Sequence, residues 1–300
     1  MLRQSRYVTS AALEEAARLG HPELDLEHLL LGLLVTGGPS AALLTTAGID
    51  LPALRRAVAE VQQHDLAHLG VQVPAPASPD GPEPSFRAAQ AIPFNDRAMA
   101  VMKRIPYDGD DRELLLALLD DEGRRVERVL AHLGADVDAL RAASAPDAAA
   151  PGITAGESDG AGFVHVQDVP VDAARVWDLV SDVRRRSEWD DACVEAGTGP
   201  DGVERLTYRG RRREVVVERV VTHLVPGREI AWRSFRVGGR ESGSTSRVRV
   251  EPVGVGCRLH LEVSPGRPTL LRRVLRPLIA RLAASQLRWH AQAIARAATR

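Results

Sequence analysis

The segment Glu27–Leu34, EHLLLGLL, is apolar on nearly every side of a helix, and it decides the fold of the first half of the chain. A helix without a polar face is stable only when other elements surround it, so we expect it inside a helical domain. The run LLLGLL from Leu29 returns as LLLALL from Leu114, and AGIDLPALRRA from Ala47 returns at nearly the same offset as LGADVDALRAA from Leu133. These two matches indicate a duplicated helical unit, each copy burying its apolar face on the other.

More helical patterns flank this segment. Ala11–Leu19 is rich in Ala, Glu, Leu and Arg and stops at Gly20, a residue that commonly ends helices. Ser40–Thr45 and Leu51–Val61 supply two further patterns. We therefore expect residues 1–145 to form an all-helical domain of two repeats.

Two segments are expected to be linkers. Val73–Ser85, VPAPASPDGPEPS, is too rich in Pro and polar residues to pack, and it would connect the two repeats. Residues 146–162 are rich in Gly and Ala and are expected to form a flexible linker to a second domain.

Bulk composition limits the classes of function. The 300 residues suffice for two domains, and a net charge of −1 favours neither nucleic acid nor an anionic membrane as partner. The sequence has no apolar run of about 18 residues that could cross a bilayer, and its first ten residues lack an apolar signal core, so we expect a cytoplasmic protein. Cys193 and Cys257 cannot form a disulfide framework or a Cys-only zinc site, and we interpret them as small core residues.

The second half of the chain, residues 163–300, changes to a strand-rich pattern. Phe163–Asp168 alternates as a strand does, and Val171–Val183 is typical of a helix. A long helical pattern ends the chain, and Pro277 is expected to kink or divide it. Five strand-like runs separated by Gly- and Pro-containing turns lie between these elements: Gly202–Tyr208, Glu214–Leu224, Glu229–Val237, Ser244–Val250 and Cys257–Val263. The order of elements predicts an α+β domain.

Three segments of the first half carry a family resemblance. Glu14–Leu34, EEAARLGHPELDLEHLLLGLL, closely resembles the first repeat of the N-terminal domain of Clp-type protein-unfolding ATPases. AGIDLPALR from Ala47 resembles the end of that repeat, and Ile92–Met102, IPFNDRAMAVM, resembles the opening of the second. The second repeat lacks the Leu-Gly-His segment, so its first helix is expected to be about two turns shorter.

The resemblance implies a domain that recruits substrates and adaptors. Some family members bind phosphorylated arginine through a glutamate in each repeat, which Glu27 matches, whereas Arg112 stands at the second place and cannot pair with a guanidinium. Other members bind cyclic peptides beside a phenylalanine that Phe94 matches, with Met99 and Lys103 nearby in the sequence. The expected site for a peptide, protein or cyclic peptide therefore consists of Glu27, Phe94, Met99 and Lys103. Alternatively, Glu27 is an acid favoured by the helix dipole and Phe94 packs between the repeats.

The second half resembles the START-like helix-grip superfamily, also called SRPBCC, which includes polyketide cyclases and lipid or hormone binders. Val169–Gly197, VPVDAARVWDLVSDVRRRSEWDDACVEAG, is similar to the superfamily's opening, and Val217–Ser234 and Arg247–Val263 fit its central hairpins. The resemblance implies a curved antiparallel sheet that grips a long C-terminal helix, with an apolar ligand cavity between them.

Large aromatic residues and one histidine are candidates for the wall of that cavity, with ordinary core packing as the alternative. They are Trp177, Trp189, Tyr208, Trp232, Phe235, His260 and Trp289. Polar groups that could serve a cyclase, among them His165, His223 and His290, form no recognisable pair by spacing, so we assign no catalytic residue. This half contains no H-x-x-x-H or C-x-x-C, and we expect no metal and no other cofactor.

These observations together favour a binding protein. The 300 residues contain no G-x-x-x-x-G-K-[ST] loop, so we expect no ATP hydrolysis by them. The leading hypothesis is a non-enzymatic adaptor, sensor or sponge linked to Clp proteolysis, whose second domain binds a small apolar molecule. The alternatives are a cyclase or aromatase with a Clp-like docking module, and a carrier of lipid-like molecules without a link to proteolysis.

Overall fold

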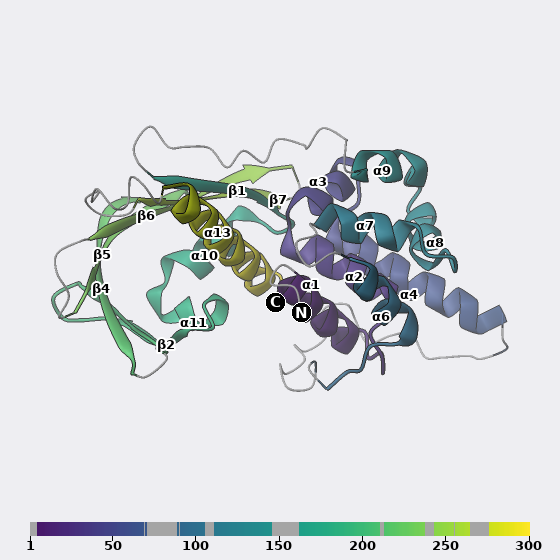
Figure 1. Cartoon of the computed structure of the whole chain (residues 1–300), viewed down its shortest axis with the longest axis horizontal. Coiled ribbons are helices and arrows are strands. Elements are labelled where there is room, and N and C mark those ends of the chain that lie inside the picture. Colours follow the sequence, from purple (N-terminus) through teal and green to yellow (C-terminus); the bar gives the residue numbers. More distant parts are fainter. Residues whose placement is uncertain are drawn as a thin grey trace. The chain divides into compact units, whose positions relative to one another are not determined.

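The chain forms two compact units, Met1–Pro151 and Gly152–Thr299, each described here by itself (Figure 1). The computed structural model describes residues 5–68, 70, 89, 91–105, 111–145, 162–210, 213–237, 243–254, 256–264 and 276–300. The predicted linker Val73–Ser85 lies outside these residues, and so does the predicted linker 146–162 except for Gly162.

The described part of the first unit is entirely helical apart from one isolated bridge. Its helices are α1 (Ser5–Arg18), α2 (Leu26–Thr36), α3 (Pro39–Thr46), α4 (Leu51–His68), α6 (Asp96–Arg104), α7 (Asp111–Leu119), α8 (Arg125–His132) and α9 (Val137–Ser144). One apolar cluster contains residues of both repeats, including Leu29 and Leu34 of α2 and Leu115 and Leu118 of α7. The two copies therefore share a single core, as the repeated apolar runs predicted.

Helix α2 is the centre of this unit, and all of its residues are buried. It begins at a capping box, in which the Asp25 side chain accepts from the helix N-terminus and the Asp25 N–H donates to Nδ1 of His28 at 2.8 Å. It ends at Gly37, whose φ of 69° lies in the left-handed region. Within the helix, a Cβ at Gly32 would come within 2.5 Å of the Val8 carbonyl oxygen, so glycine permits the close approach of α1.

The second repeat is shorter where its sequence departs from the first. Helix α6 has 9 residues, whereas α1 has 14 described residues and is preceded by residues 1–4, which are outside the described part; the described difference is about 1.4 turns at about 3.6 residues per turn. A short parallel bridge joins the repeats, because the Leu24 N–H donates to the Pro93 carbonyl at 2.8 Å and the Asn95 N–H donates to the Leu24 carbonyl at 3.0 Å.

The second unit is a seven-stranded, fully antiparallel sheet in the order β1-β7-β6-β5-β4-β3-β2. The strands are β1 (Phe163–Val169), β2 (Cys193–Thr198), β3 (Glu204–Tyr208), β4 (Val215–Val225), β5 (Glu229–Arg236), β6 (Ser244–Val253) and β7 (Gly256–Ser264). The helices are α10 (Ala173–Ser181), the 3-10 turn Val183–Arg185, α11 (Arg186–Trp189) and α13 (Arg276–Ala298). Figure 1 shows the sheet bending around the long closing helix α13 and the short helices α10 and α11, which identifies a helix-grip architecture.

The two faces of this sheet differ in chemistry because side chains alternate along each strand. The face that packs on α13, here called the inner face, includes Trp232, Val248 and Leu261, which form one core cluster with Leu287 and Ile294 of α13. The opposite, outer face carries most of the charged side chains. A bulge between Val221 and His223 interrupts the alternation in β4.

The sequence-based prediction of this unit differs from the structure at one place. Strand β2 was not expected, because CVEAGT contains Gly and small residues and has no clear alternation. The prediction that Pro277 kinks or divides the closing helical pattern also concerns residues before Arg276, and residues 265–275 lie outside the described part of the chain. The described closing helix, α13, runs from Arg276 to Ala298.

Candidate ligand site on the inner face of the sheet

A buried ion pair crosses from β3 to β4 on the inner face. Arg219 Nε donates to a carboxylate oxygen of Glu204, and these side chains are only 6% and 9% exposed. The Arg219 guanidinium also lies 4.4 Å from the centre of the Trp232 ring, a cation–π contact. Burial, with a further contribution from the nearby charge of Arg186, lowers the pKa of Arg219, while Glu204 opposes this shift.

A second buried pair lies at α11. Arg186 Nη2 is 2.9 Å from Asp190 Oδ2, one helical turn away, and the Arg186 guanidinium lies 3.8 Å from the Trp189 ring centre. The two pairs are therefore built alike, each with a guanidinium held between a carboxylate and the face of an indole.

His290 of α13 joins the second pair. Its Nε2 lies 4.0 Å from Asp190 Oδ2, and its ring meets the Trp189 ring edge-on at 6.1 Å between centres. Desolvation, reinforced by the charge of Arg186, lowers the pKa of His290 to about 4, so the imidazole is neutral near pH 7. The phenol of Tyr208 is near both arginines, and burial raises its pKa, so it too is neutral.

Two indole N–H groups in this core have no hydrogen-bond acceptor. The Nε1 atoms of Trp189 and Trp232 are buried without a partner among the described residues, although these side chains are otherwise closely packed. An unsatisfied buried donor costs about 1–3 kcal/mol, so two in one small core call for an explanation.

The structure brings together three of the seven predicted cavity residues, Trp189, Tyr208 and Trp232, around the two arginines. Trp177 packs against the same core from α10, and Trp289 is half-buried on α13 outside the sheet-facing cluster.

Phe235 and His260 lie on the outer face instead. Phe235 is paired with Glu218, next to Arg233, and His260 is 3.4 Å from Glu251. Alternation places His260 opposite Leu259 and Leu261, and Phe235 opposite Ser234 and Arg236, but it does not tell which of the two faces is the inner one.

Sequence reasoning missed the charged members of the site, Arg186, Asp190, Glu204 and Arg219. A weak signal existed for the first two, since Arg and Asp four residues apart in a short helix form a pair. No sequence signal links Glu204 to Arg219, because their contact depends on the register of β3 against β4.

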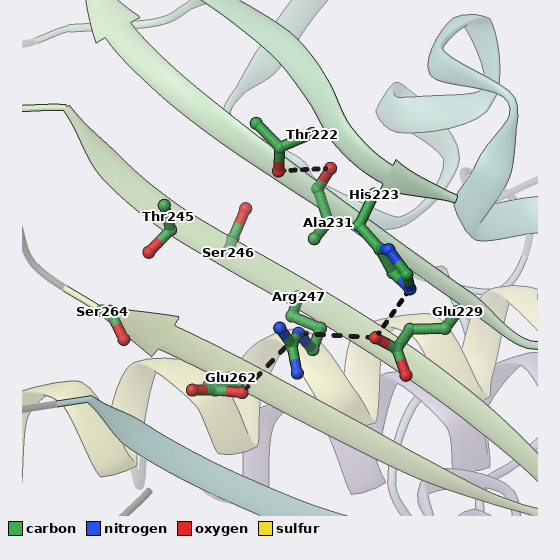
Figure 2. Close-up of a pocket in the computed structure, with 9 residues that line it drawn as sticks. All are labelled: Thr222, His223, Glu229, Ala231, Thr245, Ser246, Arg247, Glu262 and Ser264. Carbon is green, nitrogen blue, oxygen red and sulfur yellow. Dashed lines mark hydrogen bonds and ion pairs between the residues drawn. The ribbon is translucent and has the colours of Figure 1, made fainter. Parts of the chain in front are cut away.

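A separate concavity of about 510 Å³ lies on the outer face (Figure 2). It forms where the small residue Ala231 lies among longer side chains. Figure 2 shows Arg247 between Glu229 and Glu262, with Nε–oxygen distances of 3.5 and 3.9 Å, and His223 at 3.5 Å from Glu229. These charges compensate one another across neighbouring strands, which is typical of a solvated sheet face.

In the first unit, the predicted binding residues fall into two separate groups. Glu27 is buried, and its Oε1 lies 3.1 Å from Nη2 of Arg125, so the chain's own guanidinium already contacts this carboxylate. Phe94 is half-buried in the inter-repeat bridge and packs against the core. Met99 and Lys103 are exposed, four residues apart on α6.

His21, Glu27 and His28 are the one cluster of potential metal ligands found among the described residues. The Asp25 N–H donates to Nδ1 of His28, so the ring proton of neutral His28 is on Nε2, where it donates to His21 Nδ1 at 2.7 Å. A metal ion bound at Nε2 would need a free lone pair on that nitrogen, so the ring proton would have to move to Nδ1. Nδ1 could then no longer accept from the Asp25 N–H, and the helix cap would be lost. The geometry therefore fits a capping network better than a metal site.

Comparison with known proteins supports the division seen in the structure. Residues 161–299 match the family described as polyketide cyclase / dehydrase and lipid transport, and residues 3–103 match the Clp repeat N-terminal domain. One match falls in each of the two units, the helical repeat and the helix-grip fold. The chain carries a Clp repeat N-terminal domain followed by a START-like, polyketide cyclase-like domain.

Two curated relatives each match less than half of the chain. The chain is 33% identical over 136 residues to the chloroplastic chaperone protein ClpC1 of Arabidopsis thaliana, which covers 45% of this chain and 13% of the relative. The chloroplastic ClpA homolog of Brassica napus, an ATP-dependent Clp protease ATP-binding subunit, matches at 33% identity over 45% of this chain and 14% of its own length. The chain therefore spans only a small part of these relatives.

Among solved structures, a START superfamily protein from Mycobacterium smegmatis aligns with 45% of this chain and 94% of its own, at 17% identity and a TM-score of 0.36. The two domain types support a binding or adaptor role in general terms. Among the described helices, none is by itself long and apolar enough to cross a membrane. The bent pair α2–α3 reaches the necessary length and apolar composition only when its two helices are taken together.

Substituting Glu204 tests the buried ion pair. We expect Glu204→Gln to lower the free energy of unfolding of the second unit by about 3–5 kcal/mol, because Arg219 would remain buried without a counter-charge. All four tryptophans, Trp177, Trp189, Trp232 and Trp289, lie in this unit, so urea unfolding followed by tryptophan fluorescence reports on it alone.

Glu218 supplies the matched control, since it pairs with Arg205 on the same two strands one residue away but on the outer face, with side chains 37% and 47% exposed. Glu218→Gln should cost less than about 1 kcal/mol. Equal losses for the two variants would contradict the assigned burial.

Acid stability tests the capping histidine. The pKa of His28 is lowered by burial from 6.5 to about 3. Between these values the unfolded chain binds more protons than the folded chain, so the stability of the first unit should fall as pH falls from about 6.5. His28→Gln keeps an N3 acceptor for the Asp25 N–H and removes the titration. When the pH is lowered from 7.5 to 4.5, the free energy of unfolding of the first unit should fall by about 2 kcal/mol less in the variant than in the parent.

Hydrogen exchange of peptides covering α2, measured in the whole chain at both pH values, reads this difference. Comparing parent with variant cancels the opposite contribution of Glu27, whose pKa burial raises. Equal acid losses in the two proteins would show that His28 does not carry the effect.

Proposed function

We propose that this chain is a non-enzymatic binding protein. Its START-like domain holds a small, mostly apolar molecule against the inner face of the sheet, and its Clp repeat domain binds a peptide segment of a partner protein. Such a pairing suits an adaptor or sensor that couples a small molecule to a proteolytic or chaperone partner.

The two buried arginine–carboxylate pairs on the inner face carry this proposal. Replacing a buried ion pair by apolar residues of similar size is often neutral or stabilising, so stability alone does not favour two such pairs in this core. Their position between the sheet and α11, beside α13, is where a helix-grip domain would contact its ligand.

The exposed side of α6 supports the second part of the proposal. Met99 is 38% exposed, Lys103 lies one turn further, and Phe94 is half-buried at the start of the helix. An apolar side chain beside a cation suits a peptide that has an apolar anchor and an acidic neighbour. Glu27 is less suited to bind a guanidinium, because Arg125 already contacts it.

A cyclase-like activity is a second candidate, which one observation favours. His290 and Asp190 are adjacent and Tyr208 is nearby, so a histidine, a carboxylate and a phenol converge on one region. The low pKa of His290, about 4, leaves it neutral and able to accept a proton near pH 7. Turnover of an added polyketone by the purified chain would decide for this alternative.

A pair of variants on β5 tests the ligand-binding proposal. The neutral fluorophore N-phenylnaphthylamine should bind the purified whole chain saturably, with enhanced emission. Ser234→Phe adds bulk on the inner face, where Ser234 is paired with Arg219, and should weaken binding at least about tenfold. Ala231→Phe adds the same ring to the outer-face concavity and should leave binding unchanged. Absence of saturable binding, or an effect of Ala231→Phe alone, would refute the inner-face proposal.

A charge reversal on α6 tests the peptide-binding proposal. Fluorescein-labelled casein, an unfolded acidic protein, serves as the probe, and binding is followed by fluorescence anisotropy. The double variant Met99→Glu, Lys103→Glu should weaken binding at least about tenfold, because it removes the apolar contact and repels the acidic chain. Arg56→Glu, an exposed reversal on α4, is the control and should have little effect. Equal affinities for all three proteins would refute a peptide site at α6.

A further inference from the structure

The inner-face site contains more hydrogen-bond donors than its two carboxylates can accept from. Both guanidinium groups are held by carboxylates, Arg186 by Asp190 and Arg219 by Glu204. The indole N–H groups of Trp189 and Trp232 are buried and have no acceptor among the described residues. Both indoles belong to side chains that are more than nine-tenths buried, with exposures of 6% and 2%.

The site is also balanced in charge. Two guanidinium groups face two carboxylates, and both His290 and Tyr208 are neutral near pH 7. Within the part of the site that the structure describes, each of the two guanidinium groups is already paired with a carboxylate, and each carboxylate with an arginine. A charged ligand would therefore enter a low-dielectric region without a counter-charge, which is strongly unfavourable.

The arginines act on the indoles rather than on a ligand. Each guanidinium lies over one ring face, at 3.8 Å from the Trp189 centre and 4.4 Å from the Trp232 centre. This contact fixes the ring orientation and draws π-electron density toward the cation, which makes the N–H at the ring edge a stronger donor. Arg186 and Arg219 are thus positioning residues for the two donors.

We infer that the ligand of this site is an uncharged, mostly apolar molecule with an oxygen acceptor, such as a ketone carbonyl, held by the indole N–H groups of Trp189 and Trp232. The inference rests on the proposed ligand-binding function and adds the chemical class of the ligand. It excludes fatty acids and other carboxylates as preferred ligands, because their charge has no partner here.

Three compounds of one shape test this inference: fluorene, fluorenone and the fluorenecarboxylate anion. Each is titrated against N-phenylnaphthylamine bound to the whole chain. Fluorenone should displace the probe at a concentration about tenfold lower than fluorene does, the equivalent of about 1.4 kcal/mol and close to one hydrogen bond. The carboxylate should be the weakest competitor.

Tryptophan-to-phenylalanine variants assign the donors. Trp189→Phe and Trp232→Phe keep an aromatic ring but lose the N–H, so each should reduce the preference for fluorenone over fluorene while fluorene itself still competes. Trp289→Phe is the matched control, because this half-buried indole lies outside the sheet-facing core cluster, and the variant should keep the full preference.

The outcomes separate the two proposals. If the probe binds but fluorene and fluorenone compete equally, or the carboxylate competes best, the acceptor inference is overturned and ligand binding stands. A fluorenone preference that survives in both phenylalanine variants also overturns it. If the probe does not bind the parent protein, the proposed function itself fails. If one variant loses probe binding through misfolding, the parent comparison and the other variant still decide.

Discussion

A charge removed from water must receive a partner, and both units of this chain are organised around that constraint. In the first unit, Arg125 contacts Glu27 on the fully buried helix α2 and also pairs with Asp65 of α4. It thereby ties α8 of the second repeat to two helices of the first. In the second unit, the register of β3 against β4 brings Arg219 to Glu204, so each buried charge has its partner. In each case the fold places an arginine and a carboxylate that are far apart in the sequence next to each other in the interior.

The sequence was sufficient to predict the fold, because the spacing of apolar residues indicates helices and strands and the repeated apolar run indicates the duplicated unit. The apolar runs from Leu29 and Leu114 predicted two buried helices, and both are found in one core. The strand-like runs predicted six of the seven strands, and the missed one, β2, is a short edge strand with small residues. Resemblance then supplied the names of both domain types, because the Glu14–Leu34 motif is specific.

The candidate site was only partly predictable, and the reason is physical. Large aromatic residues are visible in a sequence, so Trp189 and Trp232 were identified. Their partners were not, because a contact such as Glu204 with Arg219 exists only once the strand register is set. The face on which Phe235 or His260 lies was equally hidden, since alternation gives the period of a strand but not its phase. For Glu27, resemblance suggested a free carboxylate, whereas the fold supplies Arg125 as its partner.

The bulge in β4 has a consequence for how this domain can change in length during evolution. Val221 is paired with Trp232 on the inner face and His223 with Ala231 on the outer face, so Thr222 is the additional residue between them. Its hydroxyl donates to the Ala231 carbonyl at 3.2 Å and requires no other partner in the sheet. Loss of Thr222 would turn the bulge into a regular pair and leave every other side chain on its present face. Strand β4 therefore contains a position where a single codon can be gained or lost without redistributing the residues of the inner face.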